Sequence, residues 1–113
     1  FVSGHIDGTA RFLSRRPDGE AMEYRFETGD WRKYCIPKGS IAINGTSLTI
    51  QHIETNSLTI SLIPHSRQVT TFDRLQSGSL VNIECDLMAK HLYHFTQQEQ
   101  KTDWSAFLGG GAG

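Results

Sequence analysis

The fold of this chain is decided by residues 38–49, which read KGSIAINGTSLT. The pair Asn44-Gly45 within this stretch is a turn signal, because both residue types tolerate positive φ angles. Before the turn, residues 40–43 predict a short strand, and after it residues 47–54 predict a second strand. The stretch therefore predicts a β-hairpin, and period-two alternation puts Ser47 and Thr49 on one face of its second strand.

Further short strands are predicted on either side of this hairpin. Residues 22–28 alternate between apolar and charged side chains, and they form a predicted hairpin with residues 2–14 across a turn at 15–19. A later strand begins at Leu58 and is ended by Pro64, and residues 80–86 form the last one. About six strands at such short spacing argue for a closed antiparallel barrel.

Three helical segments are expected beside the strands. Residues 30–34 predict a single helical turn capped by Thr28 or Asp30, and residues 65–72 predict a short helix. The segment from Leu87 to about Gln98 predicts a longer helix, with Met88, Leu92 and Phe95 at helical spacing. The chain then divides into a barrel over 1–86, a C-terminal helix over 87–98 and a flexible tail over 99–113.

The totals restrict the classes of function. The chain has 113 residues, which is enough for one domain with a modest core. Its net charge of -1 gives no electrostatic reason to expect nucleic acid or an anionic membrane as a partner. We expect Cys35 and Cys85 to be free buried thiols, with a single bridge as the alternative, and we expect a cytoplasmic location. Because the chain begins at Phe1 and not at Met, we also expect it to be part of a longer protein.

Two segments carry polar groups suited to a binding site. Residues 3–9, SGHIDGT, place two glycines beside His5 and Asp7, a pattern typical of backbone held close to another group. The alternative is a tight turn with a satisfied histidine. The second segment is the face shared by Ser47 and Thr49, whose hydroxyls either meet a planar polar ligand or face water.

The sequence contains no self-contained catalytic motif. It has no phosphate-binding loop, no nucleophile elbow and no cysteine pair at metal-ligand spacing. His91 and His94 are three residues apart on the predicted helix, but two such ligands are weak evidence for a metal, and a solvated helix face is the better interpretation.

Four segments taken together resemble the second, C-terminal lumazine-binding domain of riboflavin synthase. They are GHIDGT at 4–9, KGSIAINGTSLT at 38–49, LIPHS at 62–66 and VNIECD at 81–86, in the family's order and at its approximate spacing. Ser66 stands where the family commonly has Thr, and it keeps the hydroxyl. The resemblance implies an all-β fold, a six-stranded antiparallel Greek-key β-barrel with short helices and a C-terminal helix.

The resemblance also implies a reaction and a site. The family converts two molecules of 6,7-dimethyl-8-ribityllumazine into riboflavin and a ribitylamino-pyrimidinedione by four-carbon transfer, with no metal or organic cofactor. Its active site forms between the first barrel of one subunit and the second barrel of a neighbour, in a homotrimer whose C-terminal helices pack together. The implied ligand is therefore 6,7-dimethyl-8-ribityllumazine or riboflavin, and the implied partner is the first barrel of a neighbouring subunit. By position, His5 takes a catalytic role in proton transfer, and substrate binding falls to Gly4, Ile6, Lys38, Ser47, Thr49, Ser61, Ile63, His65 and Ser66.

Three hypotheses about function follow from these patterns. In the first, the chain is half of a riboflavin synthase. In the second, it is a non-catalytic module that holds lumazine or flavin. In the third, the barrel is empty and serves only subunit contacts, a hypothesis that the intact hydroxyls of Ser47, Thr49 and Ser66 disfavour.

Overall fold

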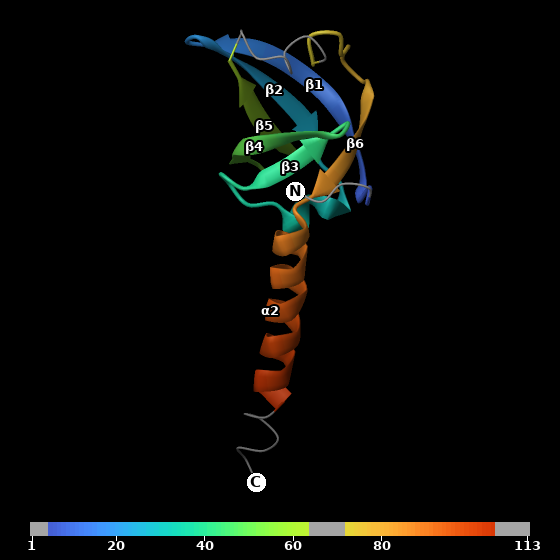
Figure 1. Ribbon diagram of the computed structural model, residues 1–113, viewed down its shortest axis with the longest axis vertical. Coiled ribbons are helices and arrows are strands. Elements are labelled where there is room, and N and C mark those ends of the chain that lie inside the picture. Colours follow the sequence, from blue (N-terminus) through green and yellow to red (C-terminus); the bar gives the residue numbers. More distant parts are fainter. Residues whose placement is uncertain (1–4, 64–71, 106–113) are drawn as a thin grey trace.

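The computed structural model describes residues 5–63 and 72–105, with side chains up to Gln98. Within these residues, six strands close into an antiparallel barrel in the order β1-β2-β5-β4-β3-β6. The strands are β1 (Gly8–Asp18), β2 (Ala21–Glu27), β3 (Ser40–Ile43), β4 (Thr46–Ile53), β5 (Ser57–Leu62) and β6 (Leu80–Cys85). A 3-10 turn, η1 (Asp30–Tyr34), lies where helix α2 (Leu87–Ser105) leaves the barrel, and α2 extends away from it (Figure 1). The predicted six-stranded antiparallel barrel is confirmed.

The order of the strands contains a Greek-key arrangement. Strands β3, β4 and β5 follow one another as neighbours, and β2 then pairs with β5 and not with β3. The four strands β2, β5, β4 and β3 therefore lie side by side with one long connection, which is the Greek-key arrangement. Closure through β1 and β6 removes the exposed strand edges that an open sheet of this size would leave.

The β3–β4 hairpin forms where the turn signal predicted it. Asn44 and Gly45 both have positive φ, 49° and 83°, as a two-residue hairpin turn requires. Ile43 pairs with Thr46 directly across the turn. The Asn44 side chain also accepts a hydrogen bond from the backbone N–H of Asn82 at 2.7 Å, which ties the turn to β6.

The first hairpin has a tighter turn than the one predicted over residues 15–19. Strand β1 runs on to Asp18, which pairs with Ala21, and only Gly19 and Glu20 form the turn. Pro17 lies within β1 opposite Met22. It is tolerated there because, among the described residues, β6 pairs with β1 only from Gly8 to Arg11, so this end of the strand lacks a neighbour on its second side.

The inner faces of the strands make one apolar core. Four aromatic rings pack against each other at centroid distances of 5.6 to 6.4 Å, those of Phe12, Tyr24, Phe26 and Phe72. Burying one such ring contributes roughly 1.5–3 kcal/mol. The aliphatic part of the core comes mainly from β3, β4, β5 and β6, with the largest fully buried side chains being Ile41, Ile43, Ile50, Leu58, Ile60, Val81 and Ile83.

Trp31 of η1 closes the end of the barrel from which α2 leaves. Its side chain is buried, and its indole N–H donates to the Thr9 carbonyl oxygen at 3.0 Å. A Cβ at position 8 would lie 2.7 Å from the Trp31 ring, so Gly8 is needed for this close approach. Gly8, the second glycine of the SGHIDGT segment, is therefore held close to a side chain of this domain itself.

The two helical segments differ in detail from the predictions. The predicted cap of η1 by Thr28 or Asp30 is wrong: Gly29 is the N-cap residue and no side chain caps the turn. A Cβ on Gly29 would lie 3.1 Å from the Trp31 indole nitrogen, so the space that a capping side chain would occupy is taken by the ring. Helix α2 starts at Leu87 as predicted and continues to Ser105, past the predicted end near Gln98. The predicted short helix over 65–72 lies outside the described residues except for Phe72.

Candidate functional site

Three of the predicted binding residues lie on one outer face of the barrel. In β4, Ser47 and Thr49 are exposed while Leu48 between them is buried, so both hydroxyls point outward. In β5, Ser61 follows Ile60, which pairs with the residue after Thr49, and this antiparallel register puts Ser61 beside Thr49. We call Ser47, Thr49 and Ser61 the hydroxyl face. Their alternation could be predicted from the sequence, but their meeting across two strands depends on the barrel.

A buried carboxylate borders the hydroxyl face. Glu23 of β2 pairs with Ser61 of β5, and its side chain is only 9% exposed. Its Oε1 accepts a hydrogen bond from Nε of Arg16 at 2.7 Å, and this bond raises the pKa of the Arg16 guanidinium above its usual value. The alternation of β2 indicated that Glu23 points away from the core, but nothing in the sequence indicated that it would be buried there.

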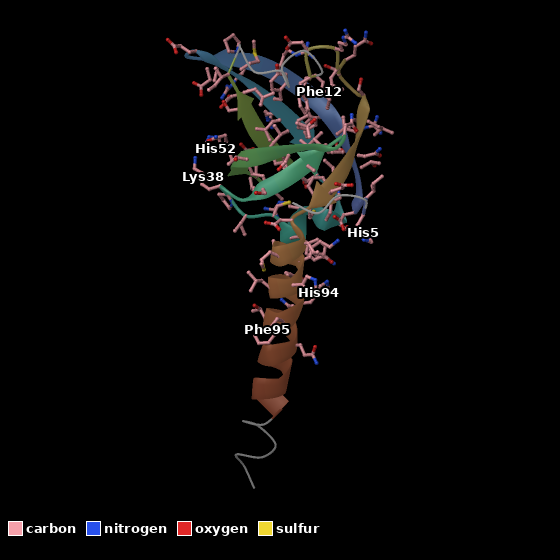
Figure 2. The ribbon with its side chains drawn as sticks, in the orientation of Figure 1. His5, Phe12, Lys38, His52, His94 and Phe95 are labelled. Carbon is pink, nitrogen blue, oxygen red and sulfur yellow. The ribbon has the colours of Figure 1, made fainter. Side chains whose placement is uncertain are left out.

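Lys38 lies next to β4, the strand that carries Ser47 and Thr49. Its backbone N–H donates to the carbonyl oxygen of Ile50 at 2.8 Å, and its φ of 68° turns the chain into β3. Its ammonium group donates to the side-chain oxygen of Gln51 in β4 at 2.9 Å. Figure 2 shows Lys38 on the same side of the barrel as His52, the next residue of β4. The predicted lysine is thus held beside the strand that carries two of the hydroxyls.

Ile63 directly follows β5, and its side chain is 67% exposed. An isoleucine held this far in solvent offers apolar area to a ligand or a partner and contributes little to the core. Three other predicted residues, Gly4, His65 and Ser66, lie outside the described residues.

The structure does not bring His5 and Ile6 to the hydroxyl face. Both precede β1, and in the closed strand order two strands separate β1 from β4 in either direction. Figure 2 accordingly shows His5 and Lys38 on opposite sides of the barrel. His5 and Ile6 are exposed at the end of the barrel near α2, so within one chain they form a second, separate group of predicted residues.

Asp7 has a structural role that the sequence did not indicate. Its Oδ2 accepts the backbone N–H of Cys85 at 2.6 Å, and its Oδ1 accepts a hydrogen bond from Nζ of Lys90 at 2.5 Å. The bond to Asp7 raises the pKa of Lys90 above its usual value. Asp7 thereby ties the start of β1 to the end of β6 and to the first turns of α2, which accounts for the acidic residue of the SGHIDGT segment.

A hollow of about 250 Å³ lies between η1 and α2, away from the hydroxyl face. Tyr34 and Tyr93 line it, and their rings meet edge to face at a centroid distance of 5.3 Å. Ile36 and Leu92 add apolar side chains that are 61% and 59% exposed. None of the residues predicted to bind substrate lines this hollow, so it marks a different surface.

The described residues carry few other signs of a specialised site. No group of three or more His, Cys, Asp or Glu side chains among them is placed to hold a metal ion. In that same part of the chain, no helix combines the length and hydropathy that a bilayer crossing requires. Both cysteines are free thiols and Cys85 is buried, as predicted, but Cys35 is only half-buried.

Comparisons with known proteins agree with this architecture. A family model described as lumazine binding domain matches residues 3–86. Riboflavin synthase of Bacillus subtilis (strain 168) is 40% identical over 114 residues, covering 96% of this chain and 53% of the relative. Riboflavin synthase of Schizosaccharomyces pombe is 37% identical over 93 residues, covering 80% of this chain and 45% of the relative. The chain thus spans about half the length of the curated relatives it matches.

Solved structures share the fold at lower identity. LumP complexed with 6,7-dimethyl-8-(1'-D-ribityl) lumazine matches with a TM-score of 0.64 and 19% identity, covering 75% of this chain and 47% of that chain. LumP complexed with riboflavin matches with a TM-score of 0.63 and 18% identity, covering 74% and 45%. These likenesses show a common barrel, and the family model with its 84 matched positions, 3–86, rests on the sequence itself. The chain therefore belongs to the lumazine-binding domain family, and its domain is of the riboflavin synthase type.

Proposed function

We propose that this chain is the second barrel of a riboflavin synthase and that its hydroxyl face binds 6,7-dimethyl-8-ribityllumazine or riboflavin. The observation that carries the proposal is the convergence of Ser47, Thr49 and Ser61 from two strands on one outer face. Within the described part of the chain these three hydroxyls have no hydrogen-bond partner, so they are available to a ligand.

The chemistry of the ligand matches the groups that surround this face. A hydroxyl both donates and accepts, which suits the alternating carbonyl and N–H groups along the pyrimidine edge of a pteridine or flavin. The exposed side chain of Ile63, just past β5, offers apolar surface to one face of the rings. Lys38 can exchange its bond to Gln51 for one to the ribityl chain, where His65 and Ser66 are also assigned by position.

The proposed reaction places one lumazine on this barrel and a second on the first barrel of a neighbouring subunit. Four carbon atoms pass from one pteridine to the other, giving riboflavin and a ribitylamino-pyrimidinedione. Holding two reactants in register can lower the activation barrier by roughly 7–11 kcal/mol. Such catalysis by positioning suits a site built from hydroxyls without a strong acid or base. His5, on the other side of the barrel, is proposed to move a proton for a ligand held at a subunit junction.

Assembly into a homotrimer is proposed through helix α2. Met88, Leu92 and Phe95 are spaced by four and three residues and share one helical face. Their side chains are 68%, 59% and 65% exposed, although they are apolar. Packing of α2 helices from several subunits would cover this stripe, and a cytoplasmic location completes the proposal.

The binding part of the proposal is tested with the double variant Ser47→Ala, Thr49→Val. Both side chains are exposed and keep strand-forming shapes, so folding should change little. If both hydroxyls bond the ligand, affinity falls by about 1–3 kcal/mol, or roughly 5- to 150-fold in Kd. Ligand fluorescence measures the change in a titration with riboflavin and with 6,7-dimethyl-8-ribityllumazine.

A matched control removes two exposed hydroxyls from the opposite side of the barrel. Thr9→Val with Ser14→Ala changes β1, which two strands separate from β4 in either direction. Its Kd should stay within about twofold of the parent chain, a difference of roughly 0.4 kcal/mol. Equal losses in both double variants, or none in the β4 variant, would show that the ligand lies elsewhere.

The catalytic part is tested separately by riboflavin formation. The chain alone should bind lumazine and turn it over at a small fraction of the rate of a two-barrel enzyme, because the partner barrel supplies the second site. Adding a separate first-barrel fragment should restore turnover. Binding without turnover even after this addition would support the non-catalytic module, and full activity of the chain alone would contradict the need for a partner barrel.

A further inference from the structure

Two thiols from distant parts of the chain meet at the junction between the barrel and α2. Cys35 directly follows η1, and Cys85 is the last residue of β6, just before α2. Both sulfurs approach the same atom, the carbonyl oxygen of Trp31, at 3.9 Å for Cys35 and 3.6 Å for Cys85. Neither cysteine has a role in the proposed binding of a lumazine.

From this geometry we propose that Cys35 and Cys85 form an oxidisable dithiol that closes to an intramolecular disulfide in the presence of a peroxide. The two residues are 50 positions apart in sequence, and the barrel holds them together through η1 and β6. The hydrogen bond between Cys85 N–H and Asp7 and the burial of Trp31 keep both backbones in place. A disulfide here would tie η1 to the base of α2.

The two thiols differ in the way that this chemistry requires. Cys35 is half-buried, so a small oxidant reaches it, whereas Cys85 is only 4% exposed. A hydrogen bond from the Cys85 thiol lowers the pKa of Cys35, and Arg32 adds to this effect. The same hydrogen bond, together with burial, raises the pKa of Cys85. Cys35 is therefore the thiolate that reacts first, and Cys85 is the resolving thiol.

Each step balances in atoms and electrons. The Cys35 thiolate attacks one oxygen of hydrogen peroxide, the O–O bond breaks, and a sulfenic acid and hydroxide form. The Cys85 sulfur then attacks the sulfenic sulfur, the S–O bond breaks, and the disulfide forms as the departing hydroxide takes up the Cys85 proton to give water. The hydroxide from the first step takes up the proton that Cys35 released on forming its thiolate, so overall two thiols and one peroxide give one disulfide and two molecules of water.

The test treats the full chain, at low concentration, with hydrogen peroxide and then alkylates it under denaturing conditions. We expect a monomer lighter by two hydrogen atoms, with neither thiol alkylated and with the Cys35 and Cys85 peptides linked in the map. In Cys85→Ala the reaction should stop at a sulfenic acid on Cys35, which dimedone traps. In Cys35→Ala the buried Cys85 should stay reduced for much longer than Cys35 does in Cys85→Ala.

The parent chain alone decides the proposal if either variant fails to fold. Peroxide-treated chains that are cross-linked only between molecules, or that carry sulfinic acid on Cys35 with Cys85 still alkylated, would overturn it. Equal oxidation rates of the two cysteines in the single variants would overturn the assigned order of reaction. The disulfide is detected without any measurement of lumazine binding. Failure of the dithiol proposal and failure of the proposed function can therefore be told apart.

Discussion

Replacing Asp7 by Asn should destabilise the junction between the barrel and α2 by more than the loss of a surface ion pair would. The Asp7 and Lys90 side chains are 12% and 20% exposed, so their 2.5 Å contact is more shielded than a surface ion pair. Surface pairs contribute about 0–1 kcal/mol, and breaking a fully buried pair costs about 3–5 kcal/mol. Asn can still accept the Cys85 N–H, so only the ion pair is lost, and we expect a loss of about 2 kcal/mol.

The pH dependence of this variant has a defined sign. The bond to Asp7 raises the pKa of Lys90 in the folded chain above its ordinary value of 10.5. The folded state then holds this proton more tightly than the unfolded state does. The stability from the pair is therefore complete below about pH 10.5 and is lost as pH rises through the folded value. In Asp7→Asn the pair is absent, so this contribution to the fall in stability at alkaline pH should disappear.

Urea unfolding followed by circular dichroism measures both effects. Glu20→Gln is the matched control, because it makes the same chemical change at an exposed position in the β1–β2 turn. The control should stay within about 0.5 kcal/mol of the parent. A double-mutant cycle with Lys90→Met should give a coupling energy of about 1–2 kcal/mol. If Asp7→Asn matches Glu20→Gln, or if the cycle gives no coupling, the structural role assigned to Asp7 is wrong.

Three further changes probe other parts of the molecule. Gly8→Ala places a Cβ 2.7 Å from the Trp31 ring, so calorimetry should show a loss of about 1–3 kcal/mol, and an unchanged melting temperature would refute the close approach. Tyr24→Phe removes a 2.7 Å bond to Asp73 and should cost about 1 kcal/mol in urea unfolding. Burial and that bond raise the pKa of Tyr24 to about 12. The parent chain should therefore lose stability as pH rises from about 10 to 12, and Tyr24→Phe should lack this contribution to the loss. Leu92→Glu changes a side chain that is 59% exposed, so it should leave folding intact and reduce self-association in sedimentation experiments; unchanged association would count against assembly through α2.

Local features of the fold could be predicted from the sequence because they depend on near neighbours. The Asn44-Gly45 turn needs positive φ at both residues, and those two residue types supply it. The alternation from Ser47 to Ile50 assigns these side chains to the two faces of β4 by period two alone, whereas beyond Ile50 the register shifts and His52 is exposed. The start of the first turn could not be predicted in this way, because Pro17 is a turn signal locally but is accommodated within β1, where that strand has only one neighbouring strand.

The features that decide the candidate site are not local. Ser61 meets Thr49 because β5 inserts between β2 and β4, and no spacing within either strand encodes that order. The burial of Glu23 on the outer face and the two bonds to Asp7 likewise arise from segments far apart in the chain. The separation of His5 from the hydroxyl face follows from the same closure. The resemblance grouped these residues by family role, and the barrel assigns them to different sides.

The most direct test of the binding proposal is an amide NMR titration of the full chain with 6,7-dimethyl-8-ribityllumazine. The proposal predicts saturable shifts, with Kd tighter than about 1 mM, centred on Ser47, Thr49 and Ser61. The amides of Tyr34 and Tyr93, which line the hollow beside α2, should move little. Shifts centred on that hollow, or none that saturate at millimolar ligand, would contradict the claim that the outer face of β4 and β5 holds a lumazine.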